Sequence, residues 1–321
     1  MDIASSPAPL FLDRERLARL MQLDDYLAAV EDAFRAYAAG RAQMPMPLHI
    51  DVESGTFHAK AASIKLDREW AAVKVNANFP GNPAKGLPTI QGAVLLFDAG
   101  NGRLLAILDS MEITSRRTAA ASALAAMYLA RLDAKSIAIC GCGEQGRAHL
   151  AAMAGVRRLE RVYAWDLDSH NAAAMVTHAK ELGIEASVEK KLRDATLASD
   201  IVVTTTSARR PFLKRECVRP GTFIAAVGAD NPHKSELHPE LFVGTTVVVD
   251  TLEQAAVMGD LHHAIEAGTA TRESVHAELA QVVVGEHRGR TRDDEITIFD
   301  STGIAIQDVA ASAAAYRRAQ A

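Results

Sequence analysis

Cysteine is scarce in this sequence: the 321 residues include three, and Cys140 and Cys142 stand one residue apart. Three cysteines make a poor disulfide framework, so the sequence predicts a reducing compartment, with the cytoplasm as the default. No apolar run approaches the roughly 18 residues of a membrane span. Positive charge does not accumulate either, because 35 Lys and Arg face 40 Asp and Glu. These absences argue against a membrane segment and against a polybasic surface for nucleic acid or lipid.

Signals for export and for repetition are also missing. Residues 1–17, MDIASSPAPLFLDRERL, lack a basic segment followed by a continuous apolar stretch, so no signal peptide is expected. No fixed-period repeat and no low-complexity tract is visible. The length fits two ordinary domains or one large α/β unit. A content of 49% hydrophobic and 23% charged residues is typical of a soluble globular protein with a substantial core.

The first third of the chain predicts a helix followed by a set of strands. Apolar residues recur at helical spacing over 24–39. Between residues 45 and 110, short apolar runs are separated by Gly, Pro, Asn and Asp, which predicts strands joined by turns, with a hairpin loop at 97–104. An Ala-rich helix is predicted over about 114–132. The predicted strands are 48–52, 56–64, 71–79 and two within 89–110.

Strand-like and helix-like segments alternate from about residue 135 to 251. Such alternation indicates a parallel sheet covered on both faces. The predicted strands are SIAIC, RVYAW, DIVVTTT, TFIAAVG and TTVVVD. A further strand and a terminal helix are predicted after residue 295, and this helix is able to return to the first domain. The predicted fold class is therefore α/β, with a doubly wound parallel sheet and a first domain that is discontinuous in sequence.

The stretch SIAICGCGEQG carries the clearest chemical signal. Gly141, Gly143 and Gly146 match G-x-G-x-x-G between a predicted strand and a predicted helix, and Asp166 follows about twenty residues after Gly146. One glycine makes the turn, one lets a pyrophosphate approach the backbone, and one allows close packing of helix and strand. Asp166 accepts ribose hydroxyls in this pattern and repels a 2′-phosphate. The sequence predicts a Rossmann-type site that prefers NAD to NADP.

A metal site in the same loop is the alternative. Cys140 and Cys142, with His149 nearby, offer thiol and imidazole ligands. Structural zinc usually needs four ligands with wider cysteine spacing, and no convincing further ligands accompany this C-x-C. Small side chains packed on a tight turn explain the cysteines, so no metal is predicted.

Several ordered motifs make the sequence resemble the ornithine cyclodeaminase/μ-crystallin family, and within it the archaeal-type alanine dehydrogenase and imine reductase branch. The motifs are KVNANFPGNPAKGLPT, SRRTAAA, GCGEQG, AVGAD and FDSTGIAIQD. The resemblance implies an NAD-binding Rossmann domain over 133–302. It also implies an α+β substrate-binding and dimerisation domain made from 1–132 and 303–321.

The resemblance also assigns roles to residues. It implies that Lys74 contacts the carboxylate or reacting region of the substrate, that Asp230 is the acid–base carboxylate, and that Thr302 contacts the substrate. Lys74 lies in an apolar strand, where an ammonium is costly unless it is paired or functional. Asp230 follows a predicted parallel strand, at the end where open α/β sheets bind ligands. The implied cofactor contacts, besides the glycines and Asp166, are Thr89, Arg117, Glu144, Gln145, Thr206, Val227, Lys234 and Ser301.

The sequence departs from the family where an arginine clamps the substrate carboxylate. Cyclodeaminases of the family carry that arginine near Pro47, the archaeal dehydrogenases carry one near His58, and neither position is Arg here. Lys60 and Arg116 are predicted to supply the missing charge as substrate contacts. Adjacent His262 and His263 lie near the position where the family often has Glu, and no catalytic role is assigned to them.

The predicted function is NADH-dependent reduction of a 2-imino acid to an L-amino acid. The imine arises from a 2-oxo acid with ammonia or an amine, or is supplied preformed, as with iminosuccinate or a cyclic ketimine. Two alternatives stay open: an ornithine cyclodeaminase that uses bound NAD catalytically, and a crystallin-like NAD(P)H-binding protein. Because the first domain has long apolar strands and few covering helices, a homodimer is also predicted.

Overall fold

The computed structural model describes residues 8–321, and the chain divides into two compact units. Unit 1 contains the chain up to Arg117 together with Ile304–Ala321, and unit 2 contains Thr118–Gly303. The sequence placed the boundary at 132, where the Ala-rich helix was expected to end. The division between the two units lies within helix α3 (Ser110–Leu129), after Arg117. The signal-peptide prediction rested partly on residues 1–7, which lie outside the described residues.

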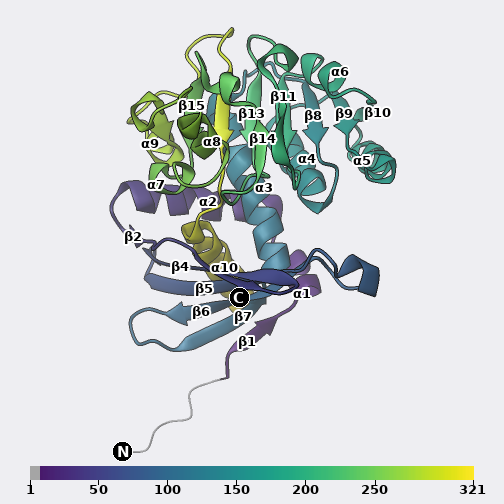
Figure 1. Cartoon of the computed structure of the whole chain (residues 1–321). Helices are drawn as coiled ribbons and strands as arrows, with labels where there is room; N and C mark the ends of the chain where they lie inside the picture. The colour runs from purple at the N-terminus through teal and green to yellow at the C-terminus, as the bar shows by residue number, and fades with distance from the viewer. Residues whose placement is uncertain (1–7) are drawn as a thin grey trace, which may run out of the picture. The chain divides into compact units, whose positions relative to one another are not determined.

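Unit 1 is built on a seven-stranded sheet in the order β1-β7-β6-β5-β4-β2, with β3 also paired to β4 (Figure 1). All pairs are antiparallel except β1 with β7. Strands expected from the sequence are present, and the loop over 97–104 closes the β6–β7 hairpin as predicted. The strands are β1 (Leu10–Leu12), β2 (Ala42–Gln43), β3 (Leu48–Val52), β4 (Gly55–Lys65), β5 (Glu69–Asn78), β6 (Ile90–Asp98) and β7 (Leu104–Asp109).

Helices cover one face of this sheet. The C-terminal helix α10 (Ala305–Gln320) packs on β4, β5, β6 and helix α2 (Leu23–Ala38), as Figure 1 shows. Side chains at even positions of β4 and β5 point toward α10 because strand side chains alternate in direction. Among these side chains, Ile64 and Trp70 are fully buried. The remaining helices of unit 1 are α1 (Arg14–Leu20), the start of α3 and the 3₁₀ turn Pro83–Lys85.

Unit 2 is a doubly wound parallel sheet of eight strands, in the order β10-β9-β8-β11-β13-β17-β15-β16 (Figure 1). The chain starts at β8, moves outward to β9 and β10, and then returns to the other side at β11. That reversal between β8 and β11 is the topological switch point of a Rossmann fold. The strands are β8 (Ser136–Cys140), β9 (Arg161–Trp165), β10 (Glu185–Val188), β11 (Ile201–Thr204), β13 (Phe223–Ala226), β15 (Thr246–Val249), β16 (Ala277–Glu278) and β17 (Thr297–Asp300).

The predicted fold class is confirmed, and the structure adds elements that apolar periodicity did not reveal. These are the short edge strands β10 and β16 and a separate parallel pair, β12 (Arg209–Leu213) with β14 (Ser235–Leu237). Polar residues interrupt each of these strands, which hides them from pattern analysis. The helices of unit 2 are α4 (Glu144–Val156), α5 (Ser169–Glu181), α6 (Leu192–Leu197), α7 (Leu252–Ala255), α8 (Asp260–Glu266) and α9 (Leu279–Val283).

The short strands β8, β11, β13 and β17 are buried at almost every position, as expected for a parallel sheet covered on both faces. Over residues 8–321, none of the helices has the length and apolar character needed to cross a bilayer.

Candidate active site

A buried group of charges occupies the α10 side of the unit 1 sheet. The Nζ of Lys74, on β5, lies 2.8 Å from Oδ2 of Asp308, in the first turn of α10. The Nε of Arg117, on α3, lies 2.8 Å from the other carboxylate oxygen, Oδ1. All three side chains are at most 4% exposed. Two cations therefore share one carboxylate in the protein interior.

Burial sets the ionisation of this group. It lowers the pKa of Lys74 to about 7, although the nearby Asp308 carboxylate opposes the change and raises it, while Arg117 and Lys60 lower it further. Burial alone would raise the pKa of Asp308, but Arg117 and Lys74 outweigh burial and hold it below the usual value. Asp308 stays ionised, and Lys74 is balanced between its two forms near neutral pH.

A buried hydrogen-bond donor accompanies these charges. The Nη1 of Arg117 donates to Oε1 of Gln307 (2.7 Å), which fixes the orientation of the amide because a guanidinium only donates. The other end of that amide, Nε2, is buried and has no hydrogen-bond partner within residues 8–321. Lys74 also donates to the Thr114 hydroxyl (3.2 Å). A buried donor beside two cations is an arrangement suited to an anion such as a carboxylate.

The sheet extends this polar surface across β4. Lys60 lies directly opposite Lys74, and His58 directly opposite Asn76, in the antiparallel β4–β5 pair. Residues opposite each other share a face, and so do residues two apart on one strand. The structure therefore places Lys60 on the same face as Lys74; its predicted contact with the substrate stays a prediction. The Nε2 of His58 lies 2.8 Å from the Thr56 hydroxyl, and its ring packs edge-on against His49.

Arg116, predicted as a substrate contact, lies outside the buried group. Its Nε pairs with Glu112 at 2.9 Å, and Arg14 approaches the same carboxylate at 3.5 Å. Adjacent residues on a helix point about 100° apart. Arg117 therefore enters the buried group, whereas Arg116 is half exposed and turned toward Glu112. The sequence showed two adjacent arginines without showing which of them is buried.

In unit 2, the glycine motif forms the turn between β8 and α4, and each glycine has a separate structural reason. Gly141 adopts a φ of +96°, a region open to glycine. A Cβ on Gly146 would come within 2.2 Å of the Gly141 carbonyl oxygen, so the helix packs against the turn. A Cβ on Gly143 would meet no atom within 4 Å. Gly143 caps α4 at its amino end, where unpaired N–H groups attract a phosphate.

Asp166 follows β9 and is tied to this turn. Its Oδ2 accepts the Cys142 N–H (2.7 Å), and its Oδ1 accepts the Asp168 N–H (2.8 Å). Each carboxylate oxygen keeps a second lone pair, so the side chain is held in place and still able to accept ribose hydroxyls. The residues therefore fit a dinucleotide: the turn is open at Gly143, and the oriented carboxylate is in the position that the motif requires.

Other predicted cofactor contacts lie at the carboxyl ends of neighbouring strands. Thr206 follows β11, Val227 follows β13 and Ser301 follows β17. These strands are parallel and adjacent, so their carboxyl ends lie at the same end of the sheet as the glycine turn. The Ser301 hydroxyl is buried and has no hydrogen-bond partner within residues 8–321. Glu144 and Gln145 begin α4, whereas Thr89 precedes β6 in unit 1, where its carbonyl accepts the Phe79 N–H.

The predicted acid–base residue, Asp230, lies in the loop after β13. Its side chain is 53% exposed, and its Oδ1 lies 2.8 Å from the Nζ of Lys234. The Nδ2 of Asn231 donates to the same oxygen (3.1 Å). A carboxylate at the open end of a parallel sheet is well placed to exchange protons with a ligand there. The predicted residues Asp230 and Lys234 are thus paired with each other.

Thr302, predicted as a substrate contact, is placed in a buried network of unit 2. Its hydroxyl donates to Oδ1 of Asp250 (2.9 Å), and its N–H donates to Oδ2 (2.8 Å). Gln254 donates to the same hydroxyl (2.8 Å). Thr302 is 1% exposed. Asp250 thus uses the hydroxyl and backbone of Thr302 to fix the turn after β17.

Three further carboxylates of unit 2, those of Glu236, Asp260 and Asp300, are fully buried near the carboxyl ends of the strands. Glu236 accepts the Thr206 N–H (2.6 Å) and the Gly228 N–H (2.8 Å), so it fixes two loops at the cofactor edge. Burial raises the pKa of Glu236. It also raises that of Asp260 to about 7, with a contribution from Glu236, and that of Asp300 well above its ordinary value.

The cysteines and His149 have packing environments. Burial raises the pKa of the Cys142 thiol to about 12, and that of Cys140 well above its usual range. His149 is fully buried, with Nδ1 on the Gln145 carbonyl (2.8 Å) and Nε2 on the Ser122 hydroxyl (3.0 Å). These contacts agree with the interpretation of the loop as a packed turn.

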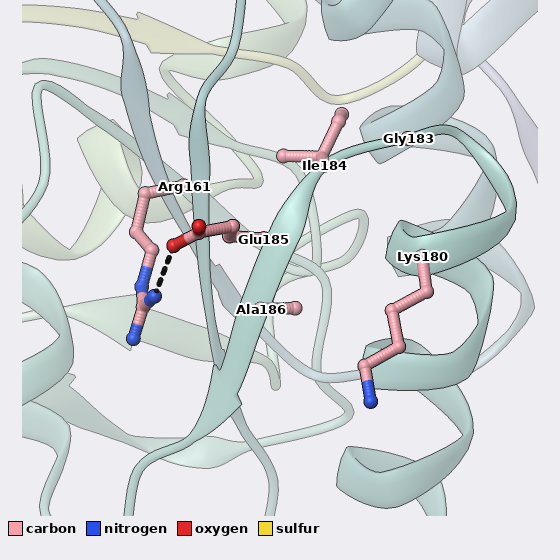
Figure 2. Close-up of a pocket in the computed structure, with 6 residues that line it drawn as sticks. All are labelled: Arg161, Lys180, Gly183, Ile184, Glu185 and Ala186. Carbon is pink, nitrogen blue, oxygen red and sulfur yellow. Dashed lines mark hydrogen bonds and ion pairs between the residues drawn. The ribbon is translucent and has the colours of Figure 1, made fainter.

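A surface depression lies at the opposite end of the unit 2 strands. Figure 2 shows Arg161, at the start of β9, and Glu185, at the start of β10, joined by an ion pair. The Nη1 of Arg161 lies 2.8 Å from Oε2 of Glu185. Ligands of open parallel sheets bind at the carboxyl ends of the strands. The depression is therefore remote, along the strands, from the glycine turn and Asp166.

Sequence reasoning missed Asp308, Gln307 and Glu236. A signal for the first existed: in IAIQDVAASAAAYRRAQA, Asp308 is the single acidic residue of a predicted helix rich in alanine. A carboxylate that faces a sheet needs a buried cation, and the strand lysine Lys74 supplies one. Glu236 gave no such signal, because it belongs to a short strand that was not predicted.

Comparisons with known proteins agree with this architecture. A sequence model of the ornithine cyclodeaminase/mu-crystallin family matches residues 8–321. A solved archaeal alanine dehydrogenase, described as a dimer with bound NAD, is 40% identical with a TM-score of 0.92, covering 97% of this chain and 96% of that chain. The Δ1-pyrroline-2-carboxylate reductase of Thermococcus litoralis, solved with NADH and L-proline, is 36% identical with a TM-score of 0.93, covering 97% of both chains. The iminosuccinate reductase of Paracoccus denitrificans, solved with NAD⁺, is 31% identical with a TM-score of 0.89, covering 97% and 96%.

Proposed function

The chain belongs to the ornithine cyclodeaminase/mu-crystallin family, and from this premise we propose that it reduces a 2-imino acid to the L-amino acid with NADH. The chain is an NAD-dependent oxidoreductase: its glycine turn and Asp166 fit the dinucleotide, and the three solved relatives above hold NAD or NADH. The observation that carries the substrate class is the buried group formed by Lys74, Arg117 and Asp308.

This buried group is suited to hold a carboxylate. With Lys74 protonated, two cations face one internal carboxylate, which leaves a net positive charge in a low-dielectric site. The unpaired Nε2 of Gln307 adds a neutral donor. A 2-imino acid brings one carboxylate next to the carbon that is reduced. Lys74 would bind that carboxylate together with Arg117, for which the sequence predicted a cofactor contact. Asp308 keeps both cations inside the protein when no substrate is bound.

Asp230 would handle the proton. Reduction of an imine adds a hydride to carbon and needs a proton on nitrogen, and bound NADH supplies the hydride. The half-exposed Asp230 carboxylate is able to exchange protons with water and to deliver one to the nitrogen. Lys234 holds the Asp230 side chain in position through their ion pair of 2.8 Å.

The case for a second carboxylate on the substrate now rests on Lys60. The prediction of a second substrate carboxylate, as in iminosuccinate, rested on Lys60 and Arg116 together. Since Arg116 is paired with Glu112, Lys60 alone supports it, and its place opposite Lys74 also suits a stronger hold on a single carboxylate. We therefore propose a 2-imino acid as the substrate class. The assay described next tests whether the preferred substrate carries a second carboxylate.

The test is a turnover assay with a matched set of substrates. The protein is incubated with NADH and, separately, with pyruvate plus ammonia, oxaloacetate plus ammonia, Δ1-pyrroline-2-carboxylate, and each oxo acid without ammonia. We expect one L-amino acid formed per NADH oxidised, and no oxidation without ammonia or a preformed imine. Proline and ammonia formed from ornithine with no net NADH consumption would instead establish the cyclodeaminase alternative.

A second copy of the chain would cover the open face of the unit 1 sheet. Strand β3 is exposed at all five positions. Its apolar side chains Leu48, Ile50 and Val52 share a face with Ala59 and Val75, through the β3–β4 and β4–β5 registers. An apolar face of this kind favours association. We propose a homodimer, and sedimentation that gives a stable monomer at micromolar concentration would contradict it.

A further inference from the structure

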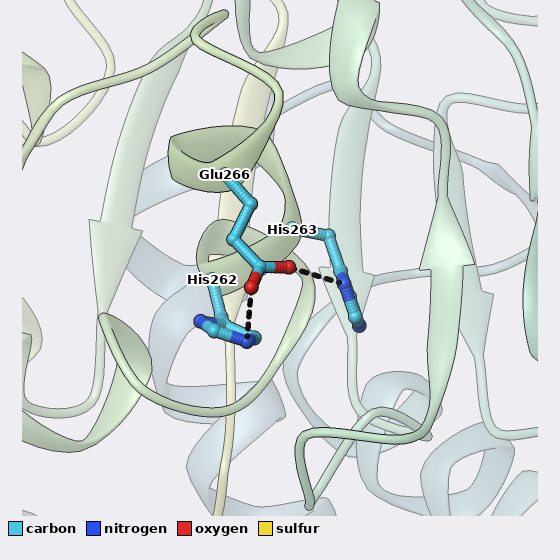
Figure 3. A group of neighbouring side chains, drawn as sticks. All are labelled: His262, His263 and Glu266. Atoms are coloured by element: carbon cyan, nitrogen blue, oxygen red, sulfur yellow. Dashed lines mark ion pairs between the residues drawn. The ribbon is translucent and has the colours of Figure 1, made fainter.

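Helix α8 carries two adjacent histidines and a glutamate whose polar atoms converge on one point. Figure 3 shows His262 and His263 turned toward the carboxylate of Glu266. The Nε2 of His262 lies 3.5 Å from Oε1 of Glu266, and the Nδ1 of His263 lies 3.6 Å from Oε2. The three ligand atoms lie within 4.8 Å of one another. The group belongs to neither the glycine turn nor the Lys74 group.

The hydrogen bonds behind the rings determine what faces the glutamate. The Nε2 of His263 is 2.9 Å from the Lys234 carbonyl oxygen, and the Nδ1 of His262 is 3.3 Å from the Ala256 carbonyl oxygen. A carbonyl only accepts, so each of these nitrogens carries the proton. In the neutral rings, the two remaining nitrogens then present lone pairs to a carboxylate that also only accepts. Three acceptors that converge in this way are satisfied either by a proton on a ring or by a metal ion held among them.

We propose that His262, His263 and Glu266 bind one divalent transition-metal ion, with Zn²⁺ as the best-matched ion. Imidazole nitrogen and carboxylate oxygen are ordinary zinc ligands. Two ligands at the usual zinc distances lie about 3.3 Å apart in a tetrahedral site, close to the 3.5 and 3.6 Å separations seen here. The outer hydrogen bonds to carbonyl oxygens are those that orient metal-binding histidines.

The surroundings favour an exchangeable ion with an open coordination position. The side chains of His262 and His263 are 21% and 23% exposed, and that of Glu266 is 63% exposed. A tetrahedral ion with three protein ligands leaves the fourth position to water. The site also reaches the Asp230 loop, because His263 holds the carbonyl of Lys234, whose Nζ pairs with Asp230. Metal binding would therefore stiffen the loop that carries Asp230.

The experiment is a zinc titration of the full chain without a polyhistidine tag. The protein is stripped with a chelator, and Zn²⁺ binding is measured by calorimetry and by competition with a chromophoric chelator. We expect one ion per chain. His262→Ala and His263→Ala should each weaken binding by about 10- to 100-fold, and Glu266→Gln should weaken it less, because an amide oxygen remains. Substitution by Co²⁺ should give the visible absorption of a low-coordinate nitrogen and oxygen site.

A second histidine pair provides the matched control. His276 and His287 also have adjacent rings, with centroids 5.6 Å apart, but they are not part of a group of three ligands among the described residues. His287→Ala should leave zinc affinity within about twofold. The proposal is overturned if zinc does not bind, or if the double variant His262→Ala/His263→Ala binds as tightly as the unchanged protein. NADH binding and far-UV circular dichroism verify that each variant is folded.

Discussion

The two units bury charge in opposite ways. In unit 1, Lys74 and Arg117 meet Asp308 in ion pairs of 2.8 Å, so cations outnumber the carboxylate. In unit 2, the hydrogen-bond partners of Glu236, Asp260 and Asp300 within residues 8–321 are N–H and O–H groups. Burial raises the pKa of all three. In the proposed function, the charge of unit 1 serves an anionic ligand, whereas the buried carboxylates of unit 2 accept hydrogen bonds that hold loops.

Within unit 2, a second difference distinguishes a carboxylate that holds loops from the carboxylate that we propose as the proton carrier. Glu236 is buried and fixes the Thr206 and Gly228 loops, whereas Asp230 is half exposed and bonded to Lys234. A group that exchanges protons during turnover needs access to water or substrate. A group that fixes a loop needs full burial and satisfied acceptors.

The largest effect is expected at Asp230. Asp230→Asn removes the proton carrier with little change in shape, so kcat should fall by about 10²- to 10⁴-fold. NADH affinity, measured by fluorescence titration, should change less than about threefold. Asp168→Asn is the control, because Asp168 is an exposed carboxylate that caps α5, and its kcat should be nearly unchanged. Full activity after Asp230→Asn would remove Asp230 from the reaction.

The buried charges of unit 1 should respond differently when either partner is removed. Asp308→Asn leaves the buried Arg117 without a counter-charge and shifts Lys74 toward its neutral form, so the free energy of unfolding should drop by about 3–5 kcal/mol. Lys74→Met leaves the Arg117–Asp308 pair intact, so stability should change by less than about 1.5 kcal/mol. Lys74→Met should still lower kcat/KM by about 10²- to 10³-fold, because a charged substrate contact is lost. Equal stability loss in both variants, measured by urea unfolding, would contradict the comparison.

The sequence did not predict most of the contacts on which the comparison of the two units rests. The glycine turn, Asp166 and the strand ends of unit 2 were predictable, because motif spacing and apolar runs are local signals. Lys74 was identified as a costly charge in an apolar strand, yet its partner Asp308 is distant in the chain and belongs to a helix whose alanines hide which face is buried. Arg116 and Arg117 could not be separated, because helix orientation is set by packing rather than by adjacency.

The loop-holding carboxylates should affect stability more than chemistry. Glu236→Gln replaces one accepting oxygen by a donor, which opposes the N–H groups of Thr206 or Gly228. The free energy of unfolding should fall by about 1–3 kcal/mol, and NADH should bind more weakly because both loops lie at the cofactor edge. Glu185→Gln, at an exposed ion pair with Arg161, should cost less than about 0.5 kcal/mol. If Glu236→Gln changes neither the free energy of unfolding nor NADH affinity, the two loops keep their conformation without Glu236.

The pH dependence of anion binding should report Lys74. Its pKa is about 7, so the ammonium predominates below pH 7 and is lost as the pH rises above it. Affinity of the NADH complex for pyrrole-2-carboxylate, whose own carboxylate does not titrate in this range, should be highest below pH 7. Above pH 7 it should fall by up to about tenfold per unit. Asp308 raises the pKa of Lys74, so Asp308→Asn should move the fall to lower pH; a fall that stays in place would exclude Lys74 as its cause.

The smallest effect is expected at Arg116. Arg116→Ala removes a half-exposed ion pair with Glu112, so kcat/KM should stay within about twofold, as for other surface pairs. Arg117→Ala, one position along, should lower kcat/KM strongly because it removes a buried cation from the Lys74 group. Steady-state kinetics of the two variants, measured side by side, would show whether the direction in which each arginine points from α3 determines its role in catalysis.

The central claim is that the Lys74 group recognises the carboxylate of an imino acid. It is tested most directly by comparing kcat/KM for Δ1-pyrroline-2-carboxylate with that for 1-pyrroline, the same ring without the carboxylate, in the unchanged protein and in Lys74→Met. We predict a preference for the carboxylate of about 10³-fold, equal to about 4 kcal/mol, which falls below about tenfold in Lys74→Met. A protein that reduces both rings equally, or a preference that Lys74→Met leaves unchanged, would contradict the claim.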